Sequence, residues 1–265
     1  MSERLITVTS KPPLGAGRIN WSHPLSRRLL CYFLLNHPGG PIDLVTQEAG
    51  TFAGTTIPAW QPRRLGMGLE YAATGQRGRF SFSGLNEAAS AIGTVFMYLT
   101  NWDAADTFGT VLFDSDTGNN VFFQLTDSVT DSAYVFAQVL TTVGISAMIN
   151  AGPLALVFTC DGTAAGKALY VNGVSQGTAS VTAPTAFSSG AKTIVVGAVA
   201  SGTGWDFDGH MMLVGYADRH WSAHDAMIFA QNPYAMLAPL YIPRGVQVSG
   251  VSVPSMQFDY RRRRV

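Results

Sequence analysis

An Asn-Gly pair at residues 172 and 173 stands between two short apolar segments, and it constrains the fold more than any other feature. Both central residues of a type I′ turn need a positive φ angle, so Asn-Gly between strands predicts a tight β-hairpin. The surrounding sequence adds an apolar strand and a polar loop before the hairpin, in ALVFTCDGTAAGKALYVNGVSQGTAS (155–180). The segment therefore predicts three successive strands.

Short runs rich in aromatic and β-branched residues recur along the chain, separated by Gly, Asn, Asp or Ser. They cover residues 29–35, 79–83, 92–99, 110–113, 121–126, 134–141, 146–149, 154–160, 169–172, 193–199 and 210–216. No helical pattern intervenes between them, which favours an antiparallel sandwich or barrel over alternating strands and helices. We expect an all-β fold.

One short helix is predicted near the C-terminal end. Ser222 precedes the segment AHDAMIFAQ, and Asp225 follows Ser222 by three residues, which is the spacing of a capping box. Asn232-Pro233 ends the helix, because the residue before a proline is disfavoured in the α conformation.

The two ends of the chain show neither the alternating pattern of a strand nor the pattern of a helix. Pro and Gly punctuate residues 1–24, and Pro239, Pro243 and Pro254 break residues 238–265 into extended pieces. We interpret both ends as extended arms that lie on a neighbouring protein. The C-terminal arm would make assembly contacts through apolar and then basic residues: Val246, Val248, Val251, Val253, Arg261, Arg262, Arg263 and Arg264.

Composition excludes several classes of protein. Charged residues make up 13% of the chain, half the usual share, and 17 basic residues balance 17 acidic ones, which argues against a dedicated nucleic-acid site. Cys31 and Cys160 lie in apolar runs, where a free cysteine behaves as a small hydrophobe. The N-terminal residues have no apolar segment typical of a signal peptide, so we expect none, and we expect synthesis in a cytoplasm. We also expect no membrane span, because the longest apolar run, residues 29–35, is far too short to cross a bilayer.

Several weak motifs occur in an order typical of one family. They are the opening LSRRLLCYFLLNHPGGPIDLVTQEAGTF, the Gly68–Tyr71 and Arg79–Phe82 segments, the 154–173 region described above, Ile194–Gly197 and Phe207–Gly209. Together they resemble laminin-G-like domains, which are concanavalin A-like lectin and glucanase jelly rolls. The resemblance implies one antiparallel jelly roll over residues 25–237. The flanking sequences resemble versions of this domain in structural proteins of tailed bacteriophages.

Two loops are candidate ligand sites. Trp102-Asp103 and Trp205-Asp206 combine an aromatic ring with a carboxylate, and both segments are predicted as exposed loops in which the ring could stack on a sugar. Asp114, Asp116 and Asn119 form a weaker calcium candidate, since hard cations take clustered oxygen ligands. The segment lacks the ligand pattern of an EF-hand, and a simple β-turn explains it as well. We predict no other metal and no cofactor.

Catalytic patterns are weak throughout the sequence. Gly173–Gly177 matches G-x-S-x-G, but it lies on the return strand of a hairpin rather than on a strand-to-helix elbow. Related glucanases place two carboxylates on one strand, whereas Glu3, Glu48, Glu70 and Glu87 have no carboxylate two residues away. Asp206 and Asp208 have that spacing, as do Asp114 and Asp116, but both pairs are at turn-like positions, where aspartates commonly cap backbone amides. We therefore expect no enzymatic activity.

Three hypotheses follow. The chain is a structural virion protein of a bacteriophage, such as a capsid decoration, cement or fibre-like component, with copies of itself and other virion proteins as partners. Alternatively, it is a carbohydrate-binding module for attachment to host-surface glycan. The third hypothesis is a glycoside hydrolase. All three stay open at this point, because one fold hosts many functions.

Overall fold

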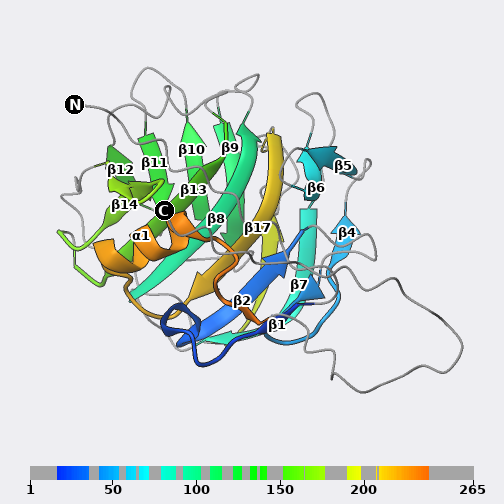
Figure 1. Ribbon diagram of the computed structural model, residues 1–265, viewed down its shortest axis with the longest axis horizontal. Helices are drawn as coiled ribbons and strands as arrows, with labels where there is room; N and C mark the ends of the chain where they lie inside the picture. Colours follow the sequence, from blue (N-terminus) through cyan, green and yellow to red (C-terminus); the bar gives the residue numbers. More distant parts are fainter. Residues whose placement is uncertain are drawn as a thin grey trace, which may run out of the picture.

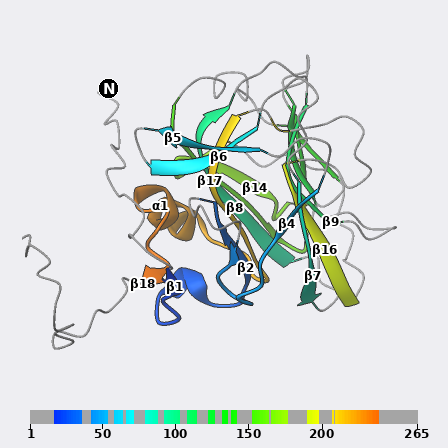
Figure 2. The ribbon, with the colours of Figure 1, turned by 90° about the vertical axis from the view of Figure 1, so that its right-hand side faces the viewer.

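The computed structural model describes residues 17–35, 42–53, 58–63, 66–71, 79–87, 92–102, 108–114, 122–126, 132–135, 138–141, 152–163, 165–176, 190–197, 207 and 209–238. Two β-sheets lie face to face, and α1 (Ala223–Gln231), the one α-helix among these residues, covers the far side of one of them. Figure 2 shows this order of layers: helix, first sheet, second sheet. Every strand pairing in the described part is antiparallel, so the predicted all-β sandwich with one helix is confirmed.

We call the sheet beneath α1 the helix-side sheet. Its central strands are β13 (Leu154–Asp161), β8 (Ile92–Trp102), β17 (Gly209–Ala217) and β2 (Leu29–Leu34), adjacent in that order. At one edge lie β14 (Ala168–Val171) and β15 (Val174–Ser175), and at the other β3 (Ile42–Asp43). A ribbon of β5 (Ala59–Arg63) and β6 (Gly66–Tyr71) joins through β6 to the start of β17. Figure 1 shows α1 in front of β8 and β13.

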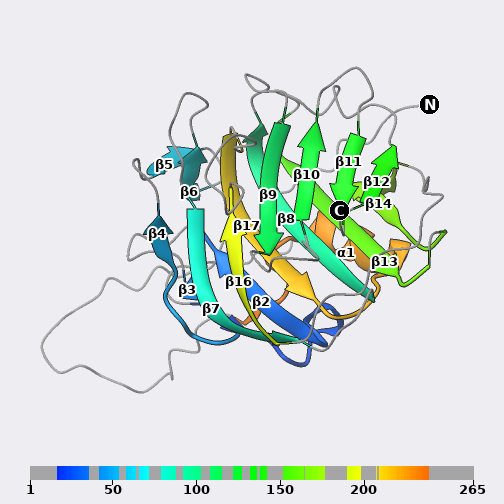
Figure 3. The same cartoon turned by 180° about the vertical axis from the view of Figure 1, so that it is seen from behind.

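The second sheet is seen from its own side in Figure 3. Its strand order is β12 (Gln138–Thr141), β11 (Ser132–Val135), β10 (Phe122–Thr126), β9 (Phe108–Asp114), β16 (Gly190–Val196), β7 (Arg79–Glu87) and β4 (Thr51–Ala53). The sequence predicts one strand over residues 134–141, and this is wrong. Val135 pairs with Gln138, so two strands form a hairpin there. The predicted strand at 146–149 lies outside the described residues.

Alternating residues of the helix-side sheet enter two different cores. Val95, Met97 and Leu99 of β8 pack between the sheets, whereas Phe96 and Tyr98 pack beneath α1. An antiparallel sheet with one solvated face would alternate apolar and polar residues. Here both faces are covered, which explains the uninterrupted apolar runs such as LALVFTC in β13, whose residues 154–160 are all buried.

The two predicted local motifs form as expected. The Asn172-Gly173 turn has φ angles of 49° and 80°, and the Asn172 side-chain oxygen accepts a hydrogen bond from the Ala155 amide at 2.8 Å. Ser222 and Asp225 make a reciprocal capping box at the start of α1, and Asn232 caps its end. Cys31 and Cys160 are free and buried.

The chain ends of the described part are joined to each other. Strand β1 (Arg18–Ile19) pairs with β18 (Leu237–Ala238), and Ile19 and Leu237 are buried. The 3-10 turn η1 (Pro24–Ser26) follows β1 and buries Leu25. Residues 17–24, which the sequence assigns to an arm, thus pack on the sandwich. Residues 1–16 and 239–265, with Val246 to Val253 and Arg261 to Arg264, lie outside the described residues.

No helix in the described part of the chain is long and apolar enough to cross a bilayer.

Candidate functional site

The strand ends that adjoin both predicted glycan loops lie next to each other at one end of the sandwich. Trp102 is the last residue of β8, and its register partner is Gly209, the first residue of β17. Tyr71, the last residue of β6, pairs with Gly209 on the other side. Trp102 therefore lies in a strand rather than in a loop as expected, and Asp103, Trp205 and Asp206 lie outside the described residues. The structure places the attachment points of the two loops side by side; we call this the Trp102 end.

Aromatic packing fixes the Trp102 end from inside. The Phe207 amide donates to the Gly197 carbonyl at 2.8 Å, which ties the start of β17 to the end of β16 in the other sheet. The buried Phe207 ring meets Tyr71 edge to face, with centroids 5.6 Å apart. Burial raises the pKa of the Tyr71 phenol well above its usual value, so this hydroxyl stays protonated at neutral pH.

A buried histidine that the sequence did not single out lies at the same end. His210 of β17 is completely buried; its Nε2–H donates to the Gln61 carbonyl at 3.2 Å, and its Nδ1 is hydrogen-bonded to the Thr100 hydroxyl. A Cβ on Gly68 would lie 2.5 Å from the ring, so only glycine leaves room for it. Because a carbonyl only accepts, Nε2 carries the proton. Both nitrogens bind protein groups, so His210 holds the β5–β6 ribbon against β17 and presents no base to solvent.

The calcium candidate lies mostly outside the described residues. Asp114 is the last residue of β9, with Ile194 of β16 as register partner, whereas Asp116 and Asn119 lie outside the described residues. Within the described ranges, no three His, Cys, Asp or Glu residues cluster in a way that could hold a metal ion.

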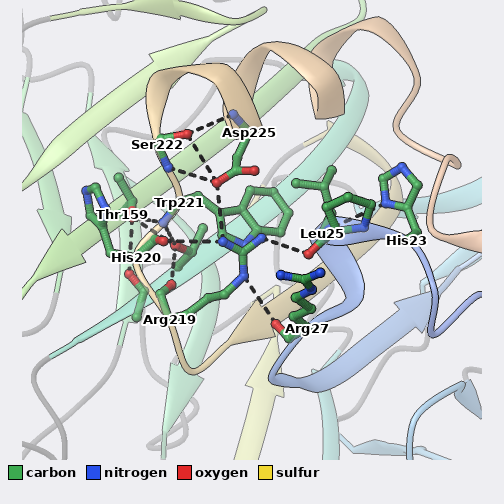
Figure 4. Close-up of polar contacts among 12 residues, drawn as sticks. His23, Leu25, Arg27, Thr159, Arg219, His220, Trp221, Ser222 and Asp225 are labelled. Atoms are coloured by element: carbon green, nitrogen blue, oxygen red, sulfur yellow. Dashed lines mark hydrogen bonds and ion pairs between the residues drawn. The ribbon is translucent and has the colours of Figure 1, made fainter.

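Arg219 organises the opposite end of β17 (Figure 4). Its guanidinium donates to the Pro24 carbonyl at 3.1 Å, to the Arg27 carbonyl at 3.2 Å and to the Asp225 carboxylate at 3.2 Å. The same group lies 5.6 Å from the centre of the Trp221 ring. Arg219 thereby fastens the N-terminal turn, residues 20–28, to the start of α1.

Two threonines complete this anchor beneath Trp221. The Trp221 amide donates to the hydroxyls of Thr159 at 2.8 Å and Thr94 at 3.0 Å, and the Thr94 hydroxyl donates to the Arg219 carbonyl at 2.7 Å. The Trp221 ring stacks on Phe96 with centroids 4.8 Å apart. The loop between β17 and α1 is therefore fixed by a hydrogen-bonded pair of buried hydroxyls and by aromatic packing.

Comparison with known proteins defines the class of fold. The sequence matches no family model, and no curated protein matches it significantly. Among solved structures, it is similar to domain 4 of AbnA, a GH43 extracellular arabinanase from Geobacillus stearothermophilus, in complex with arabinotriose. The TM-score is 0.56 at 15% identity, covering 77% of this chain and 98% of that one. The predicted jelly-roll sandwich is thus confirmed.

Two toxin domains show the same fold. The binding domain of Paraclostridial Mosquitocidal Protein 1 gives a TM-score of 0.54 at 10% identity over 78% of this chain and 52% of that one. The receptor-binding domain of botulinum neurotoxin D gives 0.51 at 10% identity over 79% and 54%. The chain spans about half the length of these two domains. At such identities the likeness concerns the fold.

Proposed function

We propose that this protein is a non-catalytic carbohydrate-binding domain of the jelly-roll class. The observation that carries the proposal is the match along nearly the whole of an arabinanase domain whose own ligand is arabinotriose. The adjacent strand ends at the Trp102 end add support, because they bring the attachment points of two Trp-Asp segments together. An aromatic ring beside hydrogen-bonding groups suits a sugar, which has apolar C–H faces and polar edges.

The proposal includes no turnover of the sugar. Glycoside hydrolysis needs two carboxylates placed across the scissile bond. The four glutamates, Glu3, Glu48, Glu70 and Glu87, have no carboxylate two residues away in the sequence. Two aspartate pairs have that spacing, Asp114/Asp116 and Asp206/Asp208, and we propose that they have local structural roles. The buried His210 has both nitrogens bound.

Binding to an array of immobilised glycans tests this function. We expect the full chain to bind a subset of glycans, and no reducing ends to be released from them on prolonged incubation. The variants Trp102→Ala and Trp205→Ala should weaken binding if the Trp102 end is the site. Absence of binding to every glycan contradicts the proposed function, and release of reducing ends that Asp208→Ala abolishes contradicts the non-catalytic part.

A structural role in a bacteriophage particle is the second proposal, and one observation favours it. Because Arg18 pairs with Ala238, residues 17 and 239 adjoin the same pair of strands. The predicted arms, 1–24 and 238–265, thus each include residues of one strand of this pair, and their remaining residues, 1–16 and 239–265, lie outside the described residues. We propose that a neighbouring protein binds both arms at this end. We propose that the protein, as a decoration or fibre-like component, binds other virion proteins and copies of itself through these arms.

Truncation after Ala238 tests the structural role, because it removes residues 239–265 and keeps β18 intact. We expect the shortened protein to be lost from the purified particle, and the full protein to be lost as added salt screens Arg261 to Arg264. Full occupancy by the truncated protein in moderate salt contradicts the proposal.

A further inference from the structure

Trp21 is the most exposed aromatic side chain in the described part of the chain. It lies between β1 and η1, and 58% of its surface is accessible, whereas Trp221 is fully buried and Trp60 packs against the core. Trp21 lies near the Ala217 end of β17, because η1 leads directly into Leu29, the register partner of Ala217. The sequence pattern Asn-Trp-Ser gives no sign of this exposure.

Hydrogen bonds of Asn20 fix the turn that carries Trp21. The Asn20 amide donates to the Met236 carbonyl at 2.8 Å, and the His23 amide donates to the Asn20 carbonyl at 2.9 Å. The Asn20 side-chain oxygen accepts from the Ser22 amide at 3.2 Å and from the Ser22 hydroxyl at 2.6 Å. A ring held outward by an anchored turn loses little conformational freedom when it binds a ligand, which favours affinity.

The turn is also fixed on its C-terminal side. His23 Nδ1 accepts from the Leu25 amide at 3.2 Å, and the Leu25 side chain is fully buried. Arg219 binds the carbonyls of Pro24 and Arg27, and Figure 4 shows the bond to Arg27. The exposure of Trp21 is therefore a property of ordered structure.

The charge around this turn is positive. Residues 17–42 contain three arginines, Arg18, Arg27 and Arg28, and no aspartate or glutamate. The carboxylate of Asp225, which lies near the turn, is ion-paired with Arg219. Arg28 is ion-paired with Asp218, whereas Arg18 and Arg27 are exposed and have no carboxylate partner among the described residues. Guanidinium groups bind carboxylates through paired N–H donors.

The surroundings of Trp21 do not suit an apolar docking patch. Such a patch would need further exposed apolar neighbours, but the residues that follow Trp21 are Ser22, His23 and Pro24.

We propose that the Trp21 turn is a binding subsite for an acidic sugar, a pyranose that carries a carboxylate. The sugar's apolar face stacks on the exposed indole, and its carboxylate is met by Arg18 or Arg27. This inference rests on the proposed carbohydrate-binding function and assigns it a site distinct from the Trp102 end. The two places lie at opposite ends of β17, whose nine residues span roughly 27 Å, so substitutions at one leave the other intact.

The experiment compares glycans bearing uronic or sialic acids with neutral glycans of the same backbones, using the full chain. Trp21→Ala should weaken binding to the acidic glycans by about tenfold or more, the loss typical of an aromatic anchor. Arg18→Ala and Arg27→Ala together should reduce the preference for acidic over neutral glycans and its sensitivity to salt. Met227→Ala, at another exposed apolar side chain (40% accessible), is the matched control and should change nothing.

The outcomes separate the two proposals. If glycan binding survives Trp21→Ala and is lost in Trp102→Ala, or if only neutral glycans bind, the Trp21 subsite is wrong and the carbohydrate-binding function stands. If no glycan binds, both fall. Because Trp21 is exposed, the melting temperature of Trp21→Ala should match that of the unmodified protein, which excludes misfolding as the cause of any loss.

Discussion

Phe96→Ala tests whether the layer beneath α1 is a true second core. Phe96 is fully buried and stacks on Trp221, and its ring also contacts Phe229, with centroids 5.3 Å apart, and Tyr32, with centroids 5.9 Å apart. Removing the ring loses the favourable free energy of burying it away from water. It also leaves a cavity that cannot close, because α1 is held in place by its capping box and by Arg219. Truncations of this kind cost about 3–5 kcal/mol. That is a large part of the roughly 5–15 kcal/mol by which a domain is stable.

Urea unfolding followed by tryptophan fluorescence measures this cost. We expect the free energy of unfolding to fall by about 3–5 kcal/mol in Phe96→Ala, and by under about 1.5 kcal/mol in Phe96→Leu, which keeps most of the volume. Ile92→Ala, on the same strand but at a side chain that is 42% accessible, is the control and should change stability by about 0.5 kcal/mol. A loss below about 1 kcal/mol in Phe96→Ala refutes the reasoning.

Gly215 offers an independent check of the same packing. A Cβ at Gly215 would lie 2.3 Å from the Phe96 ring and 2.8 Å from the Cys31 carbonyl oxygen, so Gly215→Ala should be strongly destabilising. Adding Phe96→Ala removes the clashing ring, so the double variant should lose less stability than the sum of the single variants. Strict additivity would show that the ring is not what excludes a side chain at residue 215.

Three further predictions concern single groups. Asn172→Ala should cost about 1 kcal/mol more than Asn172→Gly in urea unfolding, because both lose the bond to Ala155 but only alanine strains the positive φ; equal losses would contradict this. Burial lowers the pKa of His23, so its contribution to stability is full above about pH 6.5 and is lost as the pH falls through the lowered value. The melting temperature should thus fall less on acidification in His23→Asn, which keeps a cap acceptor, and parallel pH profiles would refute it. Burial raises the pKa of Tyr32, Tyr71, Tyr234 and Tyr98, the last to about 12, so these phenols stabilise the fold below about pH 10 and lose that effect above it. Phenolate absorbance should rise in two steps, the second coinciding with unfolding, whereas one reversible step for all nine tyrosines would contradict the prediction.

Local signals predicted the parts of the fold that local chemistry decides. The Asn172-Gly173 turn follows from the φ angles that these two residues tolerate, and the start of α1 follows from the capping partners Ser222 and Asp225. The apolar runs of β8, β13 and β17 were correctly predicted as strands. These runs are continuously apolar rather than alternating, which indicates that both faces of this sheet are buried. The pattern does not indicate that α1 covers the second face.

Long-range pairings were not predictable in the same way. The β1–β18 pair joins residues more than two hundred positions apart, and each strand has only two residues, too few to show a period. His210 stands in an apolar run, and nothing near it in sequence indicates Thr100 or Gln61 as its partners. The exposure of Trp21 likewise depends on contacts from Met236 and Arg219, which only the folded chain brings to that turn.

The Trp21 subsite and the proposed structural role make opposite demands on the β1–β18 end of the molecule. Trp21 and the paired strands of both predicted arms, β1 and β18, lie there, whereas Trp102 lies at the other end of β17. A domain anchored to a particle through its arms covers the Trp21 turn and points the Trp102 end outward. A domain that binds acidic sugar at Trp21 must keep that turn open. Because the helix-side sheet is covered on both faces, its strand ends and the N-terminal turn are what it offers a ligand. The paired variants Trp21→Ala and Trp102→Ala, measured on the free protein and on any purified particle, therefore decide which end faces the ligand.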